Sequence, residues 1–311
     1  MEYVVGLDGG GTKTAVAIAD AAGRIVHEFV SGAINFNGHH EAEIEANVRE
    51  MMRTIASHCS GGLDACEHIC IGAAGISNPA VREKLEQLVR SCGYRGRTTI
   101  LGDYETALYG AHGRPYGMIL IAGTGSICFG VNEEGRTHRT GGFGHLFDDE
   151  GSGYSIGRAL LAAVFKASDG RAPATVITEL VYAQLGIRTV EQLVRYAYDP
   201  RRSKKDIAAL APLLIDACAQ GDAAASAVAE NAARSLVELV GPVAETLDMR
   251  DGDLALAGGV LLHNAFVRDA FKDALHRTHP NLRCVPAKHD AAYGAVLAAL
   301  HRRNGGRMER R

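Results

Sequence analysis

Short apolar runs separated by glycine-rich or polar turns open the chain. Residues 3–7 are apolar and end in the turn 8–12, a second apolar run covers 15–19, and a third strand is expected over 24–29. Strands joined by tight glycine or aspartate turns are typical of an antiparallel meander. The start of the sequence therefore predicts three neighbouring antiparallel strands.

Helical spacing then alternates with buried apolar runs. Apolar residues recur at helical spacing over 41–59, and again from Pro79 to Gly93. Apolar runs at 68–73 and 98–101 predict strands, and a helix is expected after the second of them. The first 112 residues are thus expected to have the element order β-β-β-α-β-α-β-α.

The opening pattern returns about 115 residues later. Residues 118–122 are apolar and lead into the turn 123–126, after which strands are expected over 127–131 and 136–140. Repetition of this kind indicates an internal duplication. A long helical stretch over 151–247 comes next. The remaining expected elements are a strand at 253–257, a helix at 261–276, a strand at 283–285 and a helix at 291–300.

The charge balance argues against binding to nucleic acid. There are 33 Lys and Arg residues against 36 Asp and Glu, a net charge of −3, so there is no general basic field. No apolar run reaches the roughly 18 residues that span a bilayer. The acidic Glu2 is unlike the start of a signal peptide. We therefore expect a cytoplasmic protein without a membrane partner, and its seven cysteines are expected to be reduced.

The first glycine turn carries groups that can bind phosphate. Glycines let backbone N–H groups approach an anion closely, and hydroxyl and lysine side chains add donors and charge. Asp8 would repel phosphate unless a divalent cation such as Mg²⁺ lies between them. A purely structural hairpin is the alternative. The candidates in this turn are Gly10, Gly11, Thr12, Lys13 and Thr14.

Two further glycine turns extend this hypothesis. Gly123, Thr124 and Gly125 stand at the equivalent turn of the repeat, so the pair of turns could hold a polyphosphate. Gly258 and Gly259 follow a predicted strand and could seat an adenosine ring. Close packing of a helix on the strand would explain these two glycines nearly as well.

Carboxylates at two places could act on a sugar. Asp103 stands between a strand and a helix, where it could cap the helix or accept a hydroxyl proton during phosphoryl transfer. Residues 141–153 contain glycines followed by three acidic residues. Such a loop can hold sugar hydroxyls, although a solvated loop capping the helix that starts near Ser152 is the alternative.

The order of these motifs resembles the BadF/BadG/BcrA/BcrD ATPase-like family, and within it the N-acetylglucosamine kinases. The resemblance covers nearly the whole chain. It implies an α/β fold with two ribonuclease-H-like domains of the actin/hexokinase type and a central cleft for ATP and sugar. The expected domains are 1–112 and 113–287, the second with a helical insert, and the C-terminal helix within 288–311 is expected to pack on the first. Homodimers are common in this family.

The resemblance also implies roles for single residues. Asp103 matches the base that activates the sugar 6-hydroxyl, Thr12 and Thr124 match phosphate-contacting threonines, and Asp8 matches a position that holds Mg²⁺ through water. Phe143 stands where many of these kinases have Trp, which leaves the preferred sugar open. The substrate-binding candidates are Asn35, Asp103, Ser126, Gly142, Phe143, Gly144 and Asp149.

The predicted activity is ATP- and Mg²⁺-dependent phosphorylation of an amino sugar at the 6-hydroxyl, with N-acetylglucosamine as the expected substrate. Glucosamine and N-acetylmuramate kinases share these motifs and remain alternatives. An ATPase that activates a dehydratase through an iron–sulfur cluster is a rival of another class, but it would need grouped cysteines. A sugar sensor without catalytic activity is the third rival.

Overall fold

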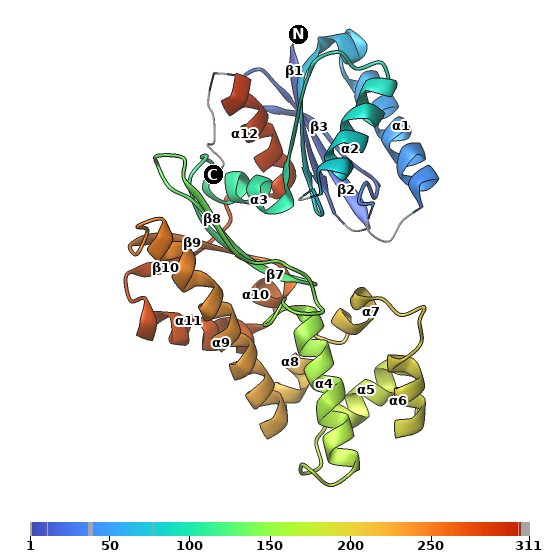
Figure 1. Ribbon diagram of the computed structural model, residues 1–311, viewed down its shortest axis with the longest axis vertical. Coiled ribbons are helices and arrows are strands. Elements are labelled where there is room, and N and C mark those ends of the chain that lie inside the picture. Colours follow the sequence, from blue (N-terminus) through green and yellow to red (C-terminus); the bar gives the residue numbers. More distant parts are fainter. Residues whose placement is uncertain (1, 11, 37–39, 77, 304, 306–311) are drawn as a thin grey trace. The chain divides into compact units, whose positions relative to one another are not determined.

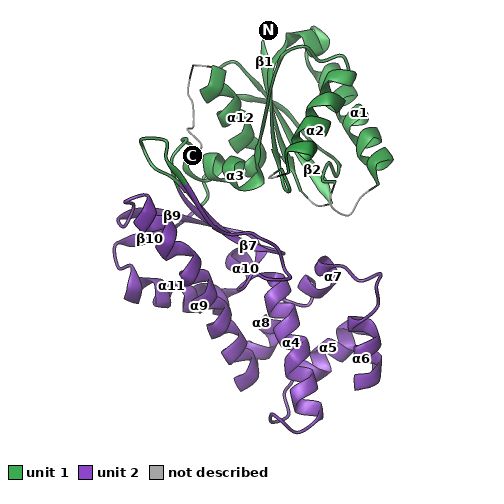
Figure 2. Cartoon of the chain, in the orientation of Figure 1, with its two compact units in different colours: residues 1–117, 131–137, 287–311 green, residues 118–130, 138–286 purple. Residues whose placement is uncertain are grey.

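The computed structural model describes residues 2–10, 12–36, 40–76, 78–303 and 305 (Figure 1). The chain forms two compact units, which Figure 2 shows in different colours. Unit 1 consists of Met1–Gly117, Val131–Thr137 and Ala287–Arg311, and unit 2 of Met118–Gly130 and His138–Pro286. No described helix is long and apolar enough to cross a membrane.

A five-stranded mixed sheet forms the centre of unit 1, in the order β3-β2-β1-β4-β5. The first three strands are antiparallel neighbours, as the turns predict, while β4 and β5 run parallel to β1. The strands are β1 (Tyr3–Gly9), β2 (Lys13–Asp20), β3 (Ile25–Gly32), β4 (Cys66–Ala73) and β5 (Arg97–Gly102). The helices are α1 (Glu41–His58), α2 (Pro79–Ser91), α3 (Asp103–His112) and α12 (Ala291–Arg303), with a short 3₁₀ helix at Gly62–Ala65.

Both faces of this sheet are covered, and the alternation of side chains along β1 shows how. Val5 and Leu7 point into a core cluster shared with α1 and α2, whereas Val4 points into a second cluster shared with α3 and α12. Side chains alternate between the faces of a strand. An apolar run without polar interruptions is therefore what a strand buried on both faces requires.

Unit 2 repeats the same strand order. Its sheet is β10-β9-β6-β7-β8, so the strands in order of sequence occupy the same places as in unit 1. This confirms the internal duplication. The strands are β6 (Gly117–Ala122), β7 (Ser126–Val131), β8 (Thr137–Gly141), β9 (Gly252–Ala257) and β10 (Leu282–Pro286). The helices are α4 (Gly153–Ser168), α5 (Ile177–Leu185), α6 (Val190–Ala197), α7 (Lys204–Ala208), α8 (Leu213–Ala219), α9 (Ala223–Thr246), α10 (Gly259–His263) and α11 (Ala265–Thr278).

One predicted helix is wrong in detail. The stretch expected as a single helix over 261–276 is divided at Asn264, which has extended backbone angles and separates α10 from α11. The Asn264 side chain accepts a hydrogen bond from the Val267 N–H at 3.2 Å and so caps α11. Asparagine competes with the helix for backbone hydrogen bonds, which favours a new N-terminus at this point.

Candidate active site

Two neighbouring carboxylates of unit 1, Asp103 and Asp290, act on the carboxylate of Asp8. Asp8 lies near the end of β1, Asp103 follows β5 and Asp290 precedes α12. Burial is the largest cause that raises the pKa of Asp8; together with the charges of Asp103 and Asp290, and against the opposing charge of Lys13, it brings this pKa to about 6. Crowded carboxylates of this kind fit a divalent cation that offsets their charge. No three His, Cys, Asp or Glu of the described residues are placed to share one ion.

Asp103 is the first residue of α3 and is half-buried. Its Oδ1 accepts a hydrogen bond from the Tyr104 N–H at 3.0 Å. The N-cap position belongs to Gly102, whose N–H donates to Glu105 Oε2 at 2.6 Å. The buried Glu105 carboxylate thus reaches back over the helix start, as the glutamate of a capping box does. The alternative that Asp103 is the capping residue of α3 is therefore wrong.

The first glycine turn connects β1 and β2. Gly10 N donates to the Asp8 carbonyl at 3.2 Å, and the side chains of Thr12 and Lys13 are exposed. Gly11 lies outside the described residues. Thr14 belongs to β2 instead of the turn and is fully buried, and its Oγ1 donates to the Gly32 carbonyl at 2.8 Å. Because its proton is used in this way, the predicted phosphate contact of the Thr14 hydroxyl is not supported.

The second glycine turn, residues 123–126, is fastened to the segment 149–154. Four hydrogen bonds join the two. They are Ser126 N–H to Asp149 Oδ1 at 3.1 Å, Ser126 Oγ–H to the Glu150 carbonyl at 2.7 Å, Gly153 N–H to the Gly123 carbonyl at 2.7 Å, and Tyr154 N–H to the Thr124 carbonyl at 3.3 Å. These hydrogen bonds therefore fix the position of the turn against the start of α4.

Asp149 is the residue whose side chain connects the two segments. Its side chain is only 3% exposed, and its backbone φ is 64°, a conformation that L-residues seldom adopt. A Cβ on Gly125 would lie 2.8 Å from Asp149 Oδ1, so glycine is required there. Asp149 and the equally buried Ser126 were predicted to contact sugar; the structure instead uses their polar groups to position the turn.

Glycines shape the loop that follows β8. Gly141, Gly142 and Gly144 all have positive φ, from 73° to 101°. The Phe143 N–H between them donates to Asp148 Oδ2 at 2.8 Å, which closes the loop. The Phe143 side chain is 72% exposed. On the other unit, the predicted sugar ligand Asn35 lies half-buried in the loop after β3.

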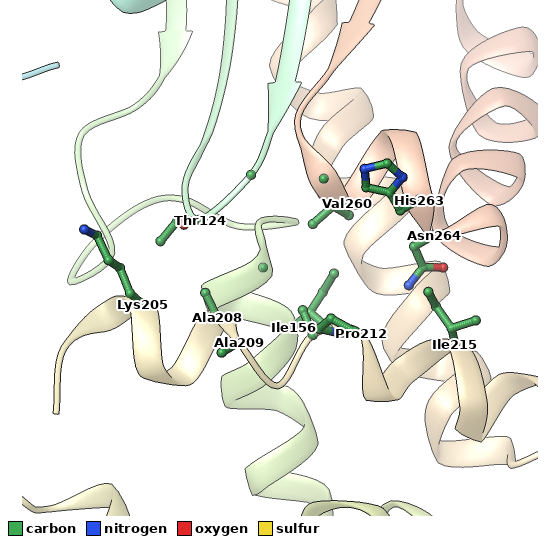
Figure 3. Close-up of a pocket in the computed structure, with 14 residues that line it drawn as sticks. Thr124, Ile156, Lys205, Ala208, Ala209, Pro212, Ile215, Val260, His263 and Asn264 are labelled. Carbon is green, nitrogen blue, oxygen red and sulfur yellow. The ribbon is translucent and has the colours of Figure 1, made fainter. Parts of the chain in front are cut away.

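A pocket of about 470 Å³ lies within unit 2 (Figure 3). Figure 3 shows Thr124 and Lys205 on one side of it and His263 and Asn264 on the other. Its floor is mainly apolar and comes from α4, α7, α8 and the α7–α8 loop. Gly123 and Gly259 complete the lining, in agreement with two of the turns selected from the sequence. A concave, mostly apolar pocket with a few polar groups is typical of a small-molecule site.

Sequence reasoning missed Lys205, His263 and Asn264. Lys205 lies inside the segment 151–247, which the sequence indicated only as a long helical stretch, so no pattern distinguished it. Gly259 lines the pocket, whereas the neighbouring Gly258 is required for packing. Its φ is 87°, and a Cβ there would lie 2.3 Å from the Ala122 carbonyl oxygen, so close packing on β6 requires this glycine.

The chain is similar to known proteins over nearly its full length. The model of the BadF/BadG/BcrA/BcrD ATPase family matches residues 5–299. An N-acetylmuramic acid/N-acetylglucosamine kinase of Clostridium acetobutylicum is 35% identical over 96% of this chain and 98% of its own. The N-acetyl-D-glucosamine kinase of Dictyostelium discoideum is 30% identical over 96% of this chain and 98% of its own.

Solved structures show the same architecture. A Chromobacterium violaceum protein, provisionally assigned as an N-acetylglucosamine kinase, has a TM-score of 0.78 and 26% identity, covering 96% of this chain and 99% of its own. A ROK family glucokinase from Streptomyces griseus has a TM-score of 0.58 at 20% identity, covering 96% and 98%, which supports the fold alone. The predicted two-domain actin/hexokinase-like fold is confirmed. The chain belongs to the BadF/BadG/BcrA/BcrD ATPase family.

Proposed function

We propose that this protein is an ATP-dependent kinase that phosphorylates N-acetylglucosamine at its 6-hydroxyl. The observation that carries the proposal is sequence identity: over nearly its full length, the chain is 35% and 30% identical to two kinases named for N-acetylglucosamine. Asp103 and the glycine turns supply the groups that such a reaction needs.

In the proposed reaction, a carboxylate oxygen of Asp103 takes the proton of the sugar 6-hydroxyl as its oxygen attacks the γ-phosphorus of ATP. The bond from the γ-phosphorus to the bridging oxygen breaks, and ADP leaves. Asn35 and the Gly142–Gly144 backbone would hold the sugar. Mg²⁺, held through water by Asp8, would offset charge on the phosphates.

We propose one binding place for the adenosine of the nucleotide and another for its phosphates. The pocket in Figure 3 is an apolar cavity that suits an adenosine ring, with His263 and Asn264 as its polar groups. Thr124 of the second glycine turn lines the same pocket, and we therefore assign the phosphates to that turn. Gly10, Gly11, Thr12, Lys13, Gly123, Thr124 and Gly125 remain the proposed phosphate-binding residues.

The test of this function is the variant Asp103→Asn. We expect kcat with N-acetylglucosamine to fall by about 10² or more, the low end for loss of a general base, because an amide cannot accept the proton. ATP should still bind with a similar Kd in calorimetry. The matched control is Asp64→Asn, an exposed aspartate of the same unit, which should keep normal turnover.

Two results would contradict the proposal in different ways. Near-normal turnover of Asp103→Asn would remove Asp103 from its role and leave the kinase assignment in place. Failure of the wild-type protein to release ADP with N-acetylglucosamine, glucosamine or N-acetylmuramic acid would end the assignment itself and favour a sugar sensor.

Location and assembly are also proposals. The seven cysteines are free, and five of them are buried, which suits a reducing cytoplasm. Cys66 and Cys70 share β4, but among the described residues no three His, Cys, Asp or Glu are grouped closely enough to hold a metal ion, which speaks against an iron–sulfur cluster. A homodimer is proposed from the family resemblance alone, and light scattering after size-exclusion chromatography would measure it.

A further inference from the structure

The position of Asp103 depends on the junction between β5 and α3, where this residue lies. Its side chain is half-buried, and its Oδ1 accepts the hydrogen bond from the adjacent Tyr104 N–H. That bond ties the carboxylate to the next residue of the same junction. A catalytic base must be held to within roughly 0.5 Å of its productive place. The backbone of the junction therefore has to be fixed if Asp103 is to act as a base.

Two buried side chains of α3 hold the junction on either side of Asp103. Before it, the Gly102 N–H donates to Glu105 Oε2 at 2.6 Å. After it, the Thr106 hydroxyl donates to the Asp103 carbonyl at 3.0 Å. Glu105 is 3% exposed and Thr106 is 0% exposed. Thr106 also packs closely on β4, since a Cβ on Gly72 would lie 2.2 Å from its Oγ1.

The carboxylate of Glu105 is a costly choice for the start of a helix. Glutamine occupies the same place in capping boxes, and burial of a charge is unfavourable unless it is well paired. The charge adds a shorter and stronger hydrogen bond, and the 2.6 Å between Gly102 N and Glu105 Oε2 is below the usual range for N–H···O bonds. In unit 2, the carboxylates that accept from the starts of α7 and α9, Asp206 and Asp222, are only half-buried. Strict placement of the residue after Gly102 explains the buried charge in α3.

We propose that Glu105 is a positioning residue of the kinase reaction, because it fixes the backbone from which Asp103 reaches the sugar hydroxyl. This inference rests on the proposed function. Glu105 itself moves no proton, since its side chain is buried and its Oε2 accepts from the Gly102 N–H. A displacement of about 1 Å can slow a reaction about 10²-fold, so loss of Glu105 should act on kcat. The glycine turns proposed to bind ATP lie outside α3, so the Kd of ATP should change little.

The experiment measures kcat, KM and thermal unfolding of Glu105→Ala and Glu105→Gln with N-acetylglucosamine and ATP. Glu105→Ala should lower kcat about 10- to 100-fold and leave both KM values within about twofold. Glu105→Gln should recover most of the lost kcat, because the amide oxygen can still accept from the Gly102 N–H. If the alanine variant does not fold, Glu105→Asp gives the same test, because its carboxylate is one methylene shorter.

A double variant tests whether Glu105 acts through Asp103. Residues that act as a unit have non-additive effects on rate. In the Asp103→Asn background, Glu105→Ala should therefore lower the remaining kcat by less than about twofold. A fall as large as the one in the wild-type background would overturn the proposal, since it would show an effect of Glu105 that does not pass through Asp103.

Asp222→Ala is the matched control for stability. Asp222 caps α9 in unit 2, where its Oδ1 accepts from the Ala225 N–H at 2.9 Å. Its loss should lower the unfolding temperature, as loss of a helix cap does, and leave kcat unchanged. A kcat of Glu105→Ala no lower than that of Asp222→Ala would make Glu105 a structural residue only. A wild type without kinase activity would overturn the proposed function itself, and with it the role of Glu105.

Discussion

Asp8 imposes an energetic cost on the protein without bound ligands. Its folded-state pKa is about 6, above the ordinary value of 3.8. Between these pH values the folded chain binds more protons than the unfolded chain, so the free energy of unfolding falls as pH rises through this window. The cost is complete above pH 6. Functional sites often retain such unfavourable groups because the chemistry requires them.

We therefore predict that Asp8→Asn stabilises the metal-free protein. At pH 7.5 the free energy of unfolding should rise by about 1–3 kcal/mol, because the amide carries no charge to desolvate or repel. At pH 4 the gain should be small, since Asp8 is then largely protonated. Urea unfolding with chelator present measures both values. Asp64→Asn should change neither, and a variant no more stable than the wild type at pH 7.5 would refute the prediction.

At the scale of residues, the sequence indicated which positions matter better than it indicated what their side chains do. The turn motifs located Thr14, Ser126 and Asp149, but each of these side chains forms hydrogen bonds with groups of its own unit. Residue type and spacing do not determine whether a hydroxyl faces a ligand or a backbone carbonyl. That choice depends on the register of β2 and on the positive φ of Asp149, which follow from tertiary packing.

The helix α12 completes the first unit at the scale of elements. It lies against β1 and α3 and contributes half of the second core cluster of this unit. Glycines allow the close approach. A Cβ on Gly6 would lie 2.3 Å from the Ala292 carbonyl oxygen, and one on Gly294 would lie 2.0 Å from that of Thr106. Backbone atoms leave no room for even a methyl group.

Gly294→Ala is therefore expected to destabilise the protein by about 1–3 kcal/mol or more, the usual cost of overpacking. The matched control is Gly241→Ala, in the middle of α9, where a Cβ would meet only His279 at 3.5 Å. That variant should gain about 0.5–1 kcal/mol, because alanine favours the helix. Thermal unfolding of both variants is the measurement. Equal effects of the two substitutions would contradict the importance of this close approach.

The element order of the first unit followed from periodicity, because its apolar runs are short and clearly bounded. The segment 151–247 was harder. Alanine-rich helices have little contrast between their faces, so the sequence did not resolve α4 to α9 or indicate that α7 and α8 form one wall of the pocket in Figure 3. Lys205 was missed for the same reason. Its position depends on where the short helix α7 packs.

The whole molecule contains separate hydrophobic cores. One cluster of buried residues belongs to unit 2, and two others belong to unit 1. Proteins with more than one domain often unfold in more than one step. Each unit can therefore respond to its own substitutions and ligands.

Phe271→Ala provides the test. Phe271 on α11 is fully buried in the core of unit 2, and its truncation should cost about 3–5 kcal/mol. We expect calorimetry to show one transition moved to lower temperature and the other little changed. ATP should raise the lowered transition by mass action, because the proposed adenosine pocket lies in unit 2.

The control is Phe266→Ala on the same helix, where the side chain is 41% exposed, and it should move neither transition by much. If both transitions fall together in Phe271→Ala, the units do not unfold separately.

The return of α12 to the first unit has a consequence for synthesis on the ribosome. The sheet of unit 1 is made first, yet one face of it is covered only in part, by α3, until the residues of α12 emerge after all of unit 2. Unit 2 has every element of its core by Pro286 and can fold earlier. The half of the protein that is translated first is thus the half that finishes folding last, and a nascent chain that stalls before Ala291 would expose Val4, Ala17 and Leu101.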